Sequence, residues 1–428
     1  MTKQNAVSLQ IPLKPNVDLV KLDKFLAKRE TSRRGNPQMK GKGNEKPFFD
    51  FSRVNTVHLA RWVIVPSDPK KNIGTSLFYS ANIDGTEANH LNTITTTKQL
   101  KDDLNEILDH CAGFDKVDKD NSSSVVAYLK KYSIKTQGFY VGAPNRSVEQ
   151  IKNEVKLYDH LREFVGKNGK KWKTKREAYK AIKANLANDP QWNWARKHYE
   201  LPKINFLMTG LLVLLLLAIL PLLILYIIVL QIVEWNYKGF EMTQSDLNQD
   251  RLTALKDEED FIYQNQLSQI FEVKSGLRRI GLKLFLFIVT YGGKYLFVKG
   301  VLFHTPTIHF ARWVLLDNGK RFIFFSNFDG SYDEYLGDFV DHNGWGLNSI
   351  YGAAVGYPRT LFMFAGGSYK IAEFMGWGRK TQVSTQIWYS AYPWHGLQQI
   401  VDKSKLRTEL FNSGDLSDEK IAEMLRRI

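Results

Sequence analysis

The chain has 428 residues, with 59 Lys and Arg against 44 Asp and Glu, and one cysteine, Cys111. This length is too great for one ordinary domain and favours two, and a single cysteine excludes both an intrachain disulfide framework and a site built from several thiolates. The net charge of +15 suits attraction to nucleic acid or to anionic lipid, so the position of the charge must decide between them.

Residues 1–50 are interpreted as an N-terminal extension. The first residues, MTKQNAVSLQIPLKPN, contain no apolar stretch behind a basic start, so we expect no cleavable secretory signal. The lack of cysteine pairs favours soluble parts that face a reducing compartment. We therefore expect them on the cytoplasmic side.

Residues 51–160 carry the first of two matching series of motifs. HLARWV, beginning at His58, predicts a strand, and LFYSANIDG, beginning at Leu77, predicts a second strand that ends in Asn-x-Asp-Gly. The amphipathic stretch 98–111 predicts a helix, and VVAYLKKY (125–132) predicts a weak strand. The spacing TQ-x2-Y-x3-P then begins at Thr136.

Residues 161–203 form a basic helical linker that leads into a membrane segment, residues 204–237. Much of the excess positive charge lies directly before the apolar run, which favours a lipid surface over nucleic acid; a solvated basic helix without a partner is the alternative. We expect a lipid membrane as partner and no nucleic acid.

The apolar run from 204 to 235 has no charge until Glu234, and about 20 residues are enough for a helix to cross the hydrocarbon core. Trp235, Tyr237 and Tyr199 are placed like interfacial aromatics. Pro221, near the middle, can kink one spanning helix or mark the tip of a re-entrant hairpin. A basic flank before the run and an acidic flank after it are typical of a single crossing.

Residues 238–303 are interpreted as a connector. Its stretch 277–303 mixes Arg and Lys with Leu, Phe and Ile, which favours a basic amphipathic helix in the headgroup plane, with a second crossing as the alternative. The preceding segment, 264–276, mixes amides with apolar residues. It could line an entry path from the membrane or form a simple helix.

Residues 304–402 carry the second series of motifs, and residues 403–428 a C-terminal helix. HFARWV begins at His309, FIFFSNFDG at Phe322 and TQ-x2-Y-x3-P at Thr385, in the same order as in the first series. Between them the pattern predicts a helix at 331–342, a strand at 360–367 and a helix at 368–380. Three ordered motifs in both series indicate an internal duplication.

Strands and helices alternate without a regular βαβ pattern, so we predict an α+β fold. In it, two ferredoxin-like repeats form a pseudo-dimeric α+β barrel, with an inserted transmembrane or re-entrant helical segment. Two half-barrels that pack on each other must lie on one side of the membrane. This conflicts with a single crossing, and we favour a kinked hairpin at Pro221 or a monotopic anchor.

Two ferredoxin-like halves on one chain resemble the dimeric α+β barrel superfamily, which includes dye-decolourising peroxidases and chlorite dismutases. The motifs HFARWV, NFDGS and TQxWYSAYP also resemble those of a bacterial membrane-associated family of unassigned activity. The peroxidases carry Gly-x-x-Asp-Gly, and here Ala81 and Ser326 replace its first glycine. The resemblance implies a haem as candidate cofactor; we predict no metal site of another kind.

The candidate site residues belong to the repeated motifs. Asp84 and Asp329 either form ordinary turns or point into a shared cavity as proton shuttles. The candidate catalytic set is Asp84, Asp329, Arg61, Arg312, Asn82 and Asn327. His58 and His309 are the candidate cofactor ligands, with His304, His342 and His395 as further histidines of suitable type. Strand alternation predicts that each motif's His and Arg point to opposite faces.

Two functions are consistent with these patterns. The first is a membrane-bound oxidoreductase that takes up a lipid-soluble substrate and that, with a haem, would be peroxidase-like. The second is a non-enzymatic protein that binds lipid or another apolar small molecule, in which the repeated motifs only shape the fold. No P-loop, GxGxxG, HExxH or CxxC occurs in the chain.

Overall fold

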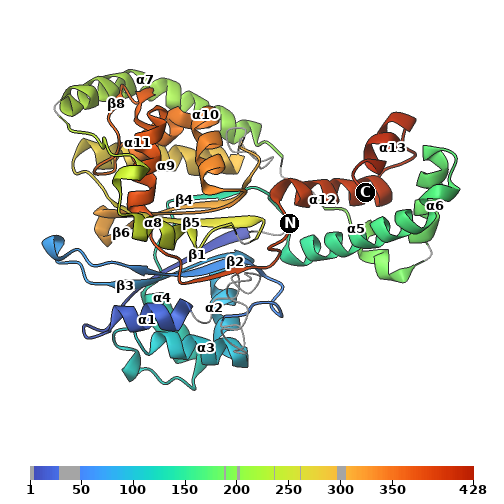
Figure 1. Ribbon diagram of the computed structural model, residues 1–428, viewed down its shortest axis with the longest axis horizontal. Coiled ribbons are helices and arrows are strands. Elements are labelled where there is room, and N and C mark those ends of the chain that lie inside the picture. The colour runs from blue at the N-terminus through green and yellow to red at the C-terminus, as the bar shows by residue number, and fades with distance from the viewer. Residues whose placement is uncertain are drawn as a thin grey trace.

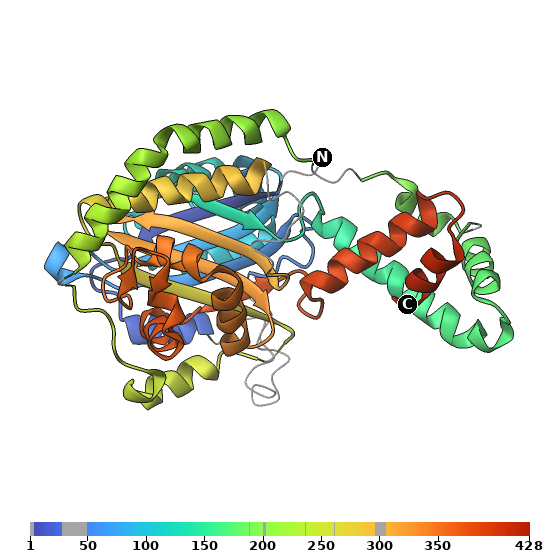
Figure 2. The ribbon, with the colours of Figure 1, turned by 90° about the horizontal axis from the view of Figure 1, so that it is seen from above.

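The computed structural model describes residues 4–27, 49–187, 189–199, 203–235, 237–260, 262–295 and 305–428. Two four-stranded antiparallel sheets face each other at its centre, helices cover both outer faces, and a helical extension projects to one side (Figures 1 and 2). The predicted α+β class with antiparallel sheets is confirmed.

Each copy of the repeat contributes three strands to its own sheet and a fourth to the other. The first sheet has the order β1 (Gln4–Pro12), β3 (Ser76–Asp84), β2 (Val57–Val65) and β10 (Ile387–Ser390). The second has the order β4 (Gly138–Val141), β6 (Ile308–Leu316), β7 (Arg321–Asp329) and β5 (Gln264–Glu272). Exchange of β4 and β10 ties the two copies together.

The described strands form no closed barrel. Before it joins the second sheet as β4, the chain touches the edge of the first sheet through the isolated bridge Leu9↔Ser133. The bridge Gln269↔Gln382 is its counterpart before β10. Because single bridges replace continuous ladders at these corners, the sheets stack as two layers, and the predicted barrel is not seen.

Two segments that the sequence interpretation placed outside the repeats are edge strands of the sheets. Residues 4–12, assigned to an N-terminal extension, form β1, whose alternate residues Val7, Leu9 and Ile11 are fully buried. Residues 264–272, predicted to be a helix or to line a path, form β5. In both, side chains alternate between the helical layer and the layer between the sheets, which is the period of a strand.

Two predicted strands are wrong. Residues 125–132 belong mostly to helix α4 (Ser122–Lys131), whose buried Val125, Tyr128 and Leu129 follow helical spacing. Residues 360–367 form a small hairpin of β8 (Thr360–Leu361) and β9 (Ala365–Gly366). Its turn places Phe362 and Met363 at positive φ, so a longer strand cannot form there.

Helices cover the outer face of each sheet (Figure 1). The first sheet packs on α1 (Leu19–Ala27), α2 (Glu87–Thr96), α3 (Lys98–Leu108) and α4. The second packs on α9 (Leu277–Tyr295), α10 (Tyr332–Tyr351) and α11 (Ile371–Thr381). The helices predicted at 98–111, 331–342 and 368–380 are thus present, although α10 extends further than predicted. A short helix, α8 (Gln249–Lys256), precedes β5.

The helical extension combines segments that the sequence interpretation kept separate. It consists of α5 (Val148–Asn168), α6 (Lys175–Ala187), α12 (Leu397–Phe411) and α13 (Asp418–Leu425). Leu157, Ile182, Leu406 and Ile421 belong to its own apolar core. The basic linker and the C-terminal helix therefore form one folded unit, because each alone would leave an apolar stripe exposed.

Helix α7 (Phe206–Glu234) is, among the described residues, the one helix long and apolar enough to cross a membrane by its length and composition. It continues through Pro221 as one helix, so the predicted hairpin at this residue is not present. The helix lies along the outside of α9 (Figures 1 and 2). The stretch 277–303, predicted to lie in the headgroup plane, provides α9, which packs between the sheet and α7; residues 296–303 lie outside the described residues.

Candidate functional site

Each copy has a β-bulge at the histidine of its HxARWV motif. The register between β2 and β3 shifts between Val57 and Leu59, and that between β6 and β7 shifts between Ile308 and Phe310. A bulge inserts one residue and reverses the alternation beyond it. His58 and Arg61 therefore both face the other sheet, and the prediction of opposite faces is wrong for both copies.

Each bulge histidine contacts the aspartate of its own NxDG motif. Nε2 of His58 lies 3.0 Å from Oδ1 of Asp84, and Nε2 of His309 lies 2.7 Å from Oδ1 of Asp329. The histidines and Asp329 are buried, and the Asp84 side chain is 9% exposed. The duplication thus brings together two equivalent His–Asp pairs.

The second oxygen of each aspartate binds the start of a long helix. Oδ2 of Asp84 accepts a hydrogen bond from the backbone N–H of Val148 (2.8 Å), and Oδ2 of Asp329 accepts one from Leu397 (2.7 Å). These are the first residues of α5 and α12, where free N–H groups and the helix dipole favour a carboxylate. The aspartates therefore connect the sheets to the helical extension.

The turn interpretation holds for the glycines of NxDG and fails for its asparagines and aspartates. Gly85 and Gly330 have positive φ, 92° and 81°, as the motif predicts. Asn82 and Asn327 do not close their own turns, because their side-chain oxygens accept hydrogen bonds from the arginines of the opposite copy.

The two arginines cross reciprocally between the sheets. Arg61 donates to the carbonyl oxygens of Leu267 (2.8 Å) and Ser326 (3.0 Å) and to Oδ1 of Asn327. Arg312 donates to the carbonyl oxygens of Val7 and Ala81, the latter at 2.6 Å, and to Oδ1 of Asn82. Each guanidinium thus joins the edge strand of the other copy's sheet to its neighbour: β5 to β7 for Arg61, and β1 to β3 for Arg312.

Both guanidinium groups are buried, and the partners named above are neutral oxygens. Burial, together with the repulsion between Arg61 and Arg312, lowers the pKa of Arg61 to about 9, and burial lowers the pKa of Arg312 to about 9. Both groups therefore remain cations at neutral pH. Buried cations need hydrogen bonds to offset their desolvation, and here the strand carbonyls supply them.

Tyr392 breaks the symmetry between the copies. Its hydroxyl lies 2.8 Å from Nδ1 of His58, and its ring centroid lies 6.2 Å from that of His309. In the repeated spacing TQ-x2-Y-x3-P, the equivalent residue of the first copy is Ala143. Burial raises the pKa of Tyr392 well above its ordinary value, so the hydroxyl stays protonated and can donate a hydrogen bond to Nδ1 of His58.

The geometry at His58 does not fit ligation of a haem iron. A carboxylate accepts, so Nε2 of His58 donates to Asp84 while Nδ1 binds the Tyr392 hydroxyl, and neither ring nitrogen is left for iron. Apolar side chains, including Leu59, Phe310 and Trp388, fill the adjacent layer between the sheets. His304 lies outside the described residues, and His342 is on α10, where it binds its own helix.

None of the eight predicted site residues lines the cavities described below. The structure brings all eight together in pairs, in the layer between the sheets, and engages them in hydrogen bonds to one another or to the backbone. Their arrangement supports a role in joining the sheets and helices.

Replacing Asp329 with Asn should lower the free energy of unfolding by about 1–2 kcal/mol. Asn can still accept from Leu397, but the charge at the start of α12 and the charge-assisted bond to His309 are lost. Urea unfolding in mild detergent measures this loss, with the exposed Asp338→Asn as control. An unchanged stability in Asp329→Asn would contradict the joining role.

A long apolar groove lies between α7 and α9. Its volume is about 410 Å³, and the residues facing it are almost all apolar. Leu212, Leu216 and Leu223 of α7 form one wall, and Leu284 and Ile288 of α9 form the other. Cavities of this size and character accept apolar small molecules.

The outer face of α7 is apolar and exposed. Leu214, Leu217, Leu222 and Leu225 each expose more than half of their surface. Phe362 and Phe364 of the β8–β9 hairpin and Phe287 of α9 are also exposed large apolar residues. An apolar surface of this extent is typical of a protein that contacts lipid or another protein.

The body-facing stripe of α7 has helical spacing. It consists of Thr209, Leu212, Leu216, Ile219, Leu223, Tyr226, Leu230 and Glu234, which are partly or fully buried. At the C-terminal end, Glu234 binds Nζ of Lys274 (3.1 Å), a guanidinium nitrogen of Arg278 and Oγ1 of Thr360 (2.9 Å). Tyr226 donates to the carbonyl oxygen of Leu277 (3.1 Å). The helix is therefore docked at this end by a buried carboxylate.

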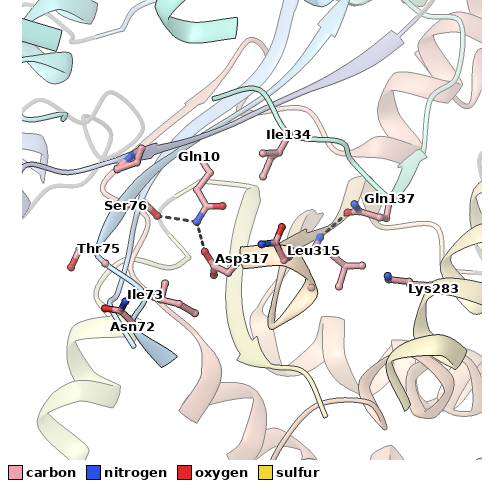
Figure 3. Close-up of a pocket in the computed structure, with 14 residues that line it drawn as sticks. Gln10, Asn72, Ile73, Thr75, Ser76, Ile134, Gln137, Lys283, Leu315 and Asp317 are labelled. Carbon is pink, nitrogen blue, oxygen red and sulfur yellow. Dashed lines mark hydrogen bonds between the residues drawn. The ribbon is translucent and has the colours of Figure 1, made fainter. Parts of the chain in front are cut away.

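A polar cavity of about 810 Å³ lies at the end of the sheets away from the His–Asp pairs. Figure 3 shows that Gln10 donates to Ser76 (3.2 Å) and to Asp317 (3.1 Å), while Gln137 accepts from the backbone of Leu315 (2.6 Å). The side-chain amides of Gln10 and Gln137, which face the cavity, are thus engaged in hydrogen bonds. The polar residues at this end therefore join the two sheets through their loops.

Sequence reasoning missed a repeated pair of amides. Gln4-Asn5 begins β1 and Gln264-Asn265 begins β5, and the asparagines donate equivalently to the carbonyl oxygens of Gly85 and Gly330. The shared dipeptide QN, followed three residues later by Ser8 or Ser268, was the signal that could have extended the repeat to these strands.

Comparisons with family models, curated proteins and solved structures give no match.

Proposed function

We propose that the chain is a membrane-attached, non-enzymatic protein that holds an apolar ligand, such as a lipid acyl chain, in the groove between α7 and α9. The groove supports this proposal most directly, because its walls are apolar and one wall is the helix that suits a lipid environment. The engaged hydrogen bonds of the predicted catalytic residues favour binding over chemistry.

The composition of α7 supports contact with lipid on its outer side. A helix that lies on a soluble protein normally has a polar outer face, whereas α7 is apolar all round. Packing on α9 explains one apolar side, and acyl chains would explain the other. In water, the exposed apolar surface of Leu214, Leu217 and their neighbours would carry the free-energy cost of hydrating apolar groups.

The connections of α7 support a monotopic arrangement. Helices α5 and α6 of the helical extension precede α7 in the chain, and α8 and then β5 of the second sheet follow it. The extension is joined to the sheets through Asp84 and Asp329, and β5 belongs to the second sheet, so both ends of α7 belong to one body (Figure 2). We therefore propose that α7 lies along the membrane surface, with both copies on the same, cytoplasmic side.

We further propose that each copy is a ferredoxin-like unit with an exchanged fourth strand. In each copy a strand is followed by a helix, then by two strands, then by further helices, and then by the exchanged fourth strand. This order of strands and helices supports the proposal. The exchange of β4 and β10 between sheets is consistent with a pseudo-dimer derived from the α+β barrel architecture.

A bulky residue in the groove tests this function. Leu284→Trp should reduce the lipid that co-purifies with the full chain severalfold, because the indole fills space between α7 and α9. Phe287→Trp is the matched control, since Phe287 is on the same helix but does not line the groove. Mass spectrometry of molecules extracted from detergent-purified protein measures the bound lipid.

The wild type should carry an apolar molecule, and both variants should still float with liposomes. Wild-type protein that carries no apolar molecule, or equal amounts in Leu284→Trp and Phe287→Trp, would refute the groove as a binding site. Failure of the wild type to float with liposomes would refute membrane attachment.

A further inference from the structure

The base of the helical extension contains a basic cavity of about 530 Å³ between α5 and α12. Five of its lining residues carry a guanidinium, ammonium or imidazole group: Arg146, His198, Lys203, Lys405 and Arg407. Its described lining residues include no carboxylate. Lys203 lies two residues before Asn205, which caps the start of α7. The cavity is therefore close to where the chain enters the proposed membrane helix.

The floor of this cavity holds two buried guanidinium groups, and the buried carboxylate that they approach, Glu154, lies behind the lining residues. Nε of Arg407 donates to Glu154 (2.8 Å). Nε of Arg146 donates to the hydroxyl of Ser404 (2.8 Å), which in turn donates to Glu154. One carboxylate thus faces two cations. Burial, with repulsion from Arg407, lowers the pKa of Arg146, although Glu154 opposes this change.

The rim adds donors without adding negative charge. His198 and Lys203 are exposed and line the cavity beside the hydroxyls of Ser404 and Thr408, which already donate to Glu154 and to the carbonyl oxygen of Ser404. Lys405 is a surface residue that also pairs with Glu423 (3.1 Å). An anion in the cavity would offset the unmatched positive charge of the floor and could accept hydrogen bonds from both floor and rim.

We propose that this cavity binds a phosphate group, carried either by a lipid headgroup or by a small soluble phosphate compound. Guanidinium pairs with flanking lysines suit the tetrahedral, multiply charged oxygens of phosphate. The site is separate from the α7–α9 groove, and the two can succeed or fail independently.

Removing one cation at the rim or the floor tests the site. The full chain in detergent is titrated calorimetrically with inorganic phosphate, and separately with short-chain phosphatidic acid and with diacylglycerol of the same chains. Lys203→Gln should weaken phosphate-dependent binding about fivefold, and Arg146→Gln about tenfold. Lys180→Gln, an exposed position on α6 outside the cavity, is the matched control for loss of charge.

The pattern across ligands identifies the source of the phosphate. Weaker binding of phosphatidic acid alone supports a lipid headgroup, and weaker binding of inorganic phosphate supports a soluble ligand. Equal effects of Lys203→Gln and Lys180→Gln on every ligand would overturn the proposal. Lys203 is exposed, so this comparison remains valid even if Arg146→Gln fails to fold. Leu284→Trp should leave phosphate binding unchanged, which separates this site from the groove.

Discussion

Arg61→Ala should lower the free energy of unfolding by about 3–5 kcal/mol. The substitution removes a buried guanidinium and its hydrogen bonds to the carbonyl oxygens of Leu267 and Ser326 and to Asn327, whose side-chain oxygen keeps only the indole N–H of Trp388 (3.2 Å) as donor. The shortened side chain also leaves a void between the sheets. Urea unfolding of detergent-purified protein measures the change.

Arg53 provides a control, because it is an exposed arginine close to the same strand. Arg53→Ala should change stability by less than about 0.5 kcal/mol. Arg312→Ala should cost about as much as Arg61→Ala, since it makes the equivalent contacts in the opposite direction. If Arg61→Ala and Arg53→Ala were equally stable, the crossed arginines would not hold the sheets together.

Glu234→Gln should destabilise the docking of α7 by about 3–5 kcal/mol. Its carboxylate is buried against Lys274 and Arg278, and the amide would leave the buried Arg278 and the partly buried Lys274 without this negative partner. The last turns of α7 should then separate from α9 more often. Hydrogen exchange of residues 226–234 and urea unfolding measure these two effects.

The exposed Glu241→Gln is the matched control, since it removes the same charge outside the buried cluster. It should leave hydrogen exchange in α7 unchanged. Slow exchange at residues 226–234 in Glu234→Gln, equal to that of the wild type, would show that apolar packing alone docks the helix.

Much of the fold follows from local pattern. The apolar length of 204–235, the strands at HxARWV and NxDG, and helices such as 98–108 were predictable because periodicity and residue type act over a few residues. The predicted strand at 360–367 failed because the reversal at Phe362 and Met363 depends on backbone angles that the apolar composition does not indicate.

For the candidate site, the residues could be identified from the sequence, but their arrangement could not. The repeated motifs singled out His58, His309, Asp84 and Asp329 as candidate site residues, and the structure pairs each histidine with the aspartate of its own copy. Their faces were predicted incorrectly, because a bulge adds a residue without a sequence signal strong enough to mark it. The role of Tyr392 was not predictable, since its partner His58 is 334 residues away.

The repeated α+β motifs and the one long apolar helix could be recognised from the sequence, because both properties reside in short patterns and composition. Tertiary structure alone decided that β4 and β10 exchange between sheets, that Arg61 and Arg312 cross, and that α7 docks through Glu234. Each of these depends on contacts between residues that are far apart in the chain. Local periodicity carries no information about such contacts.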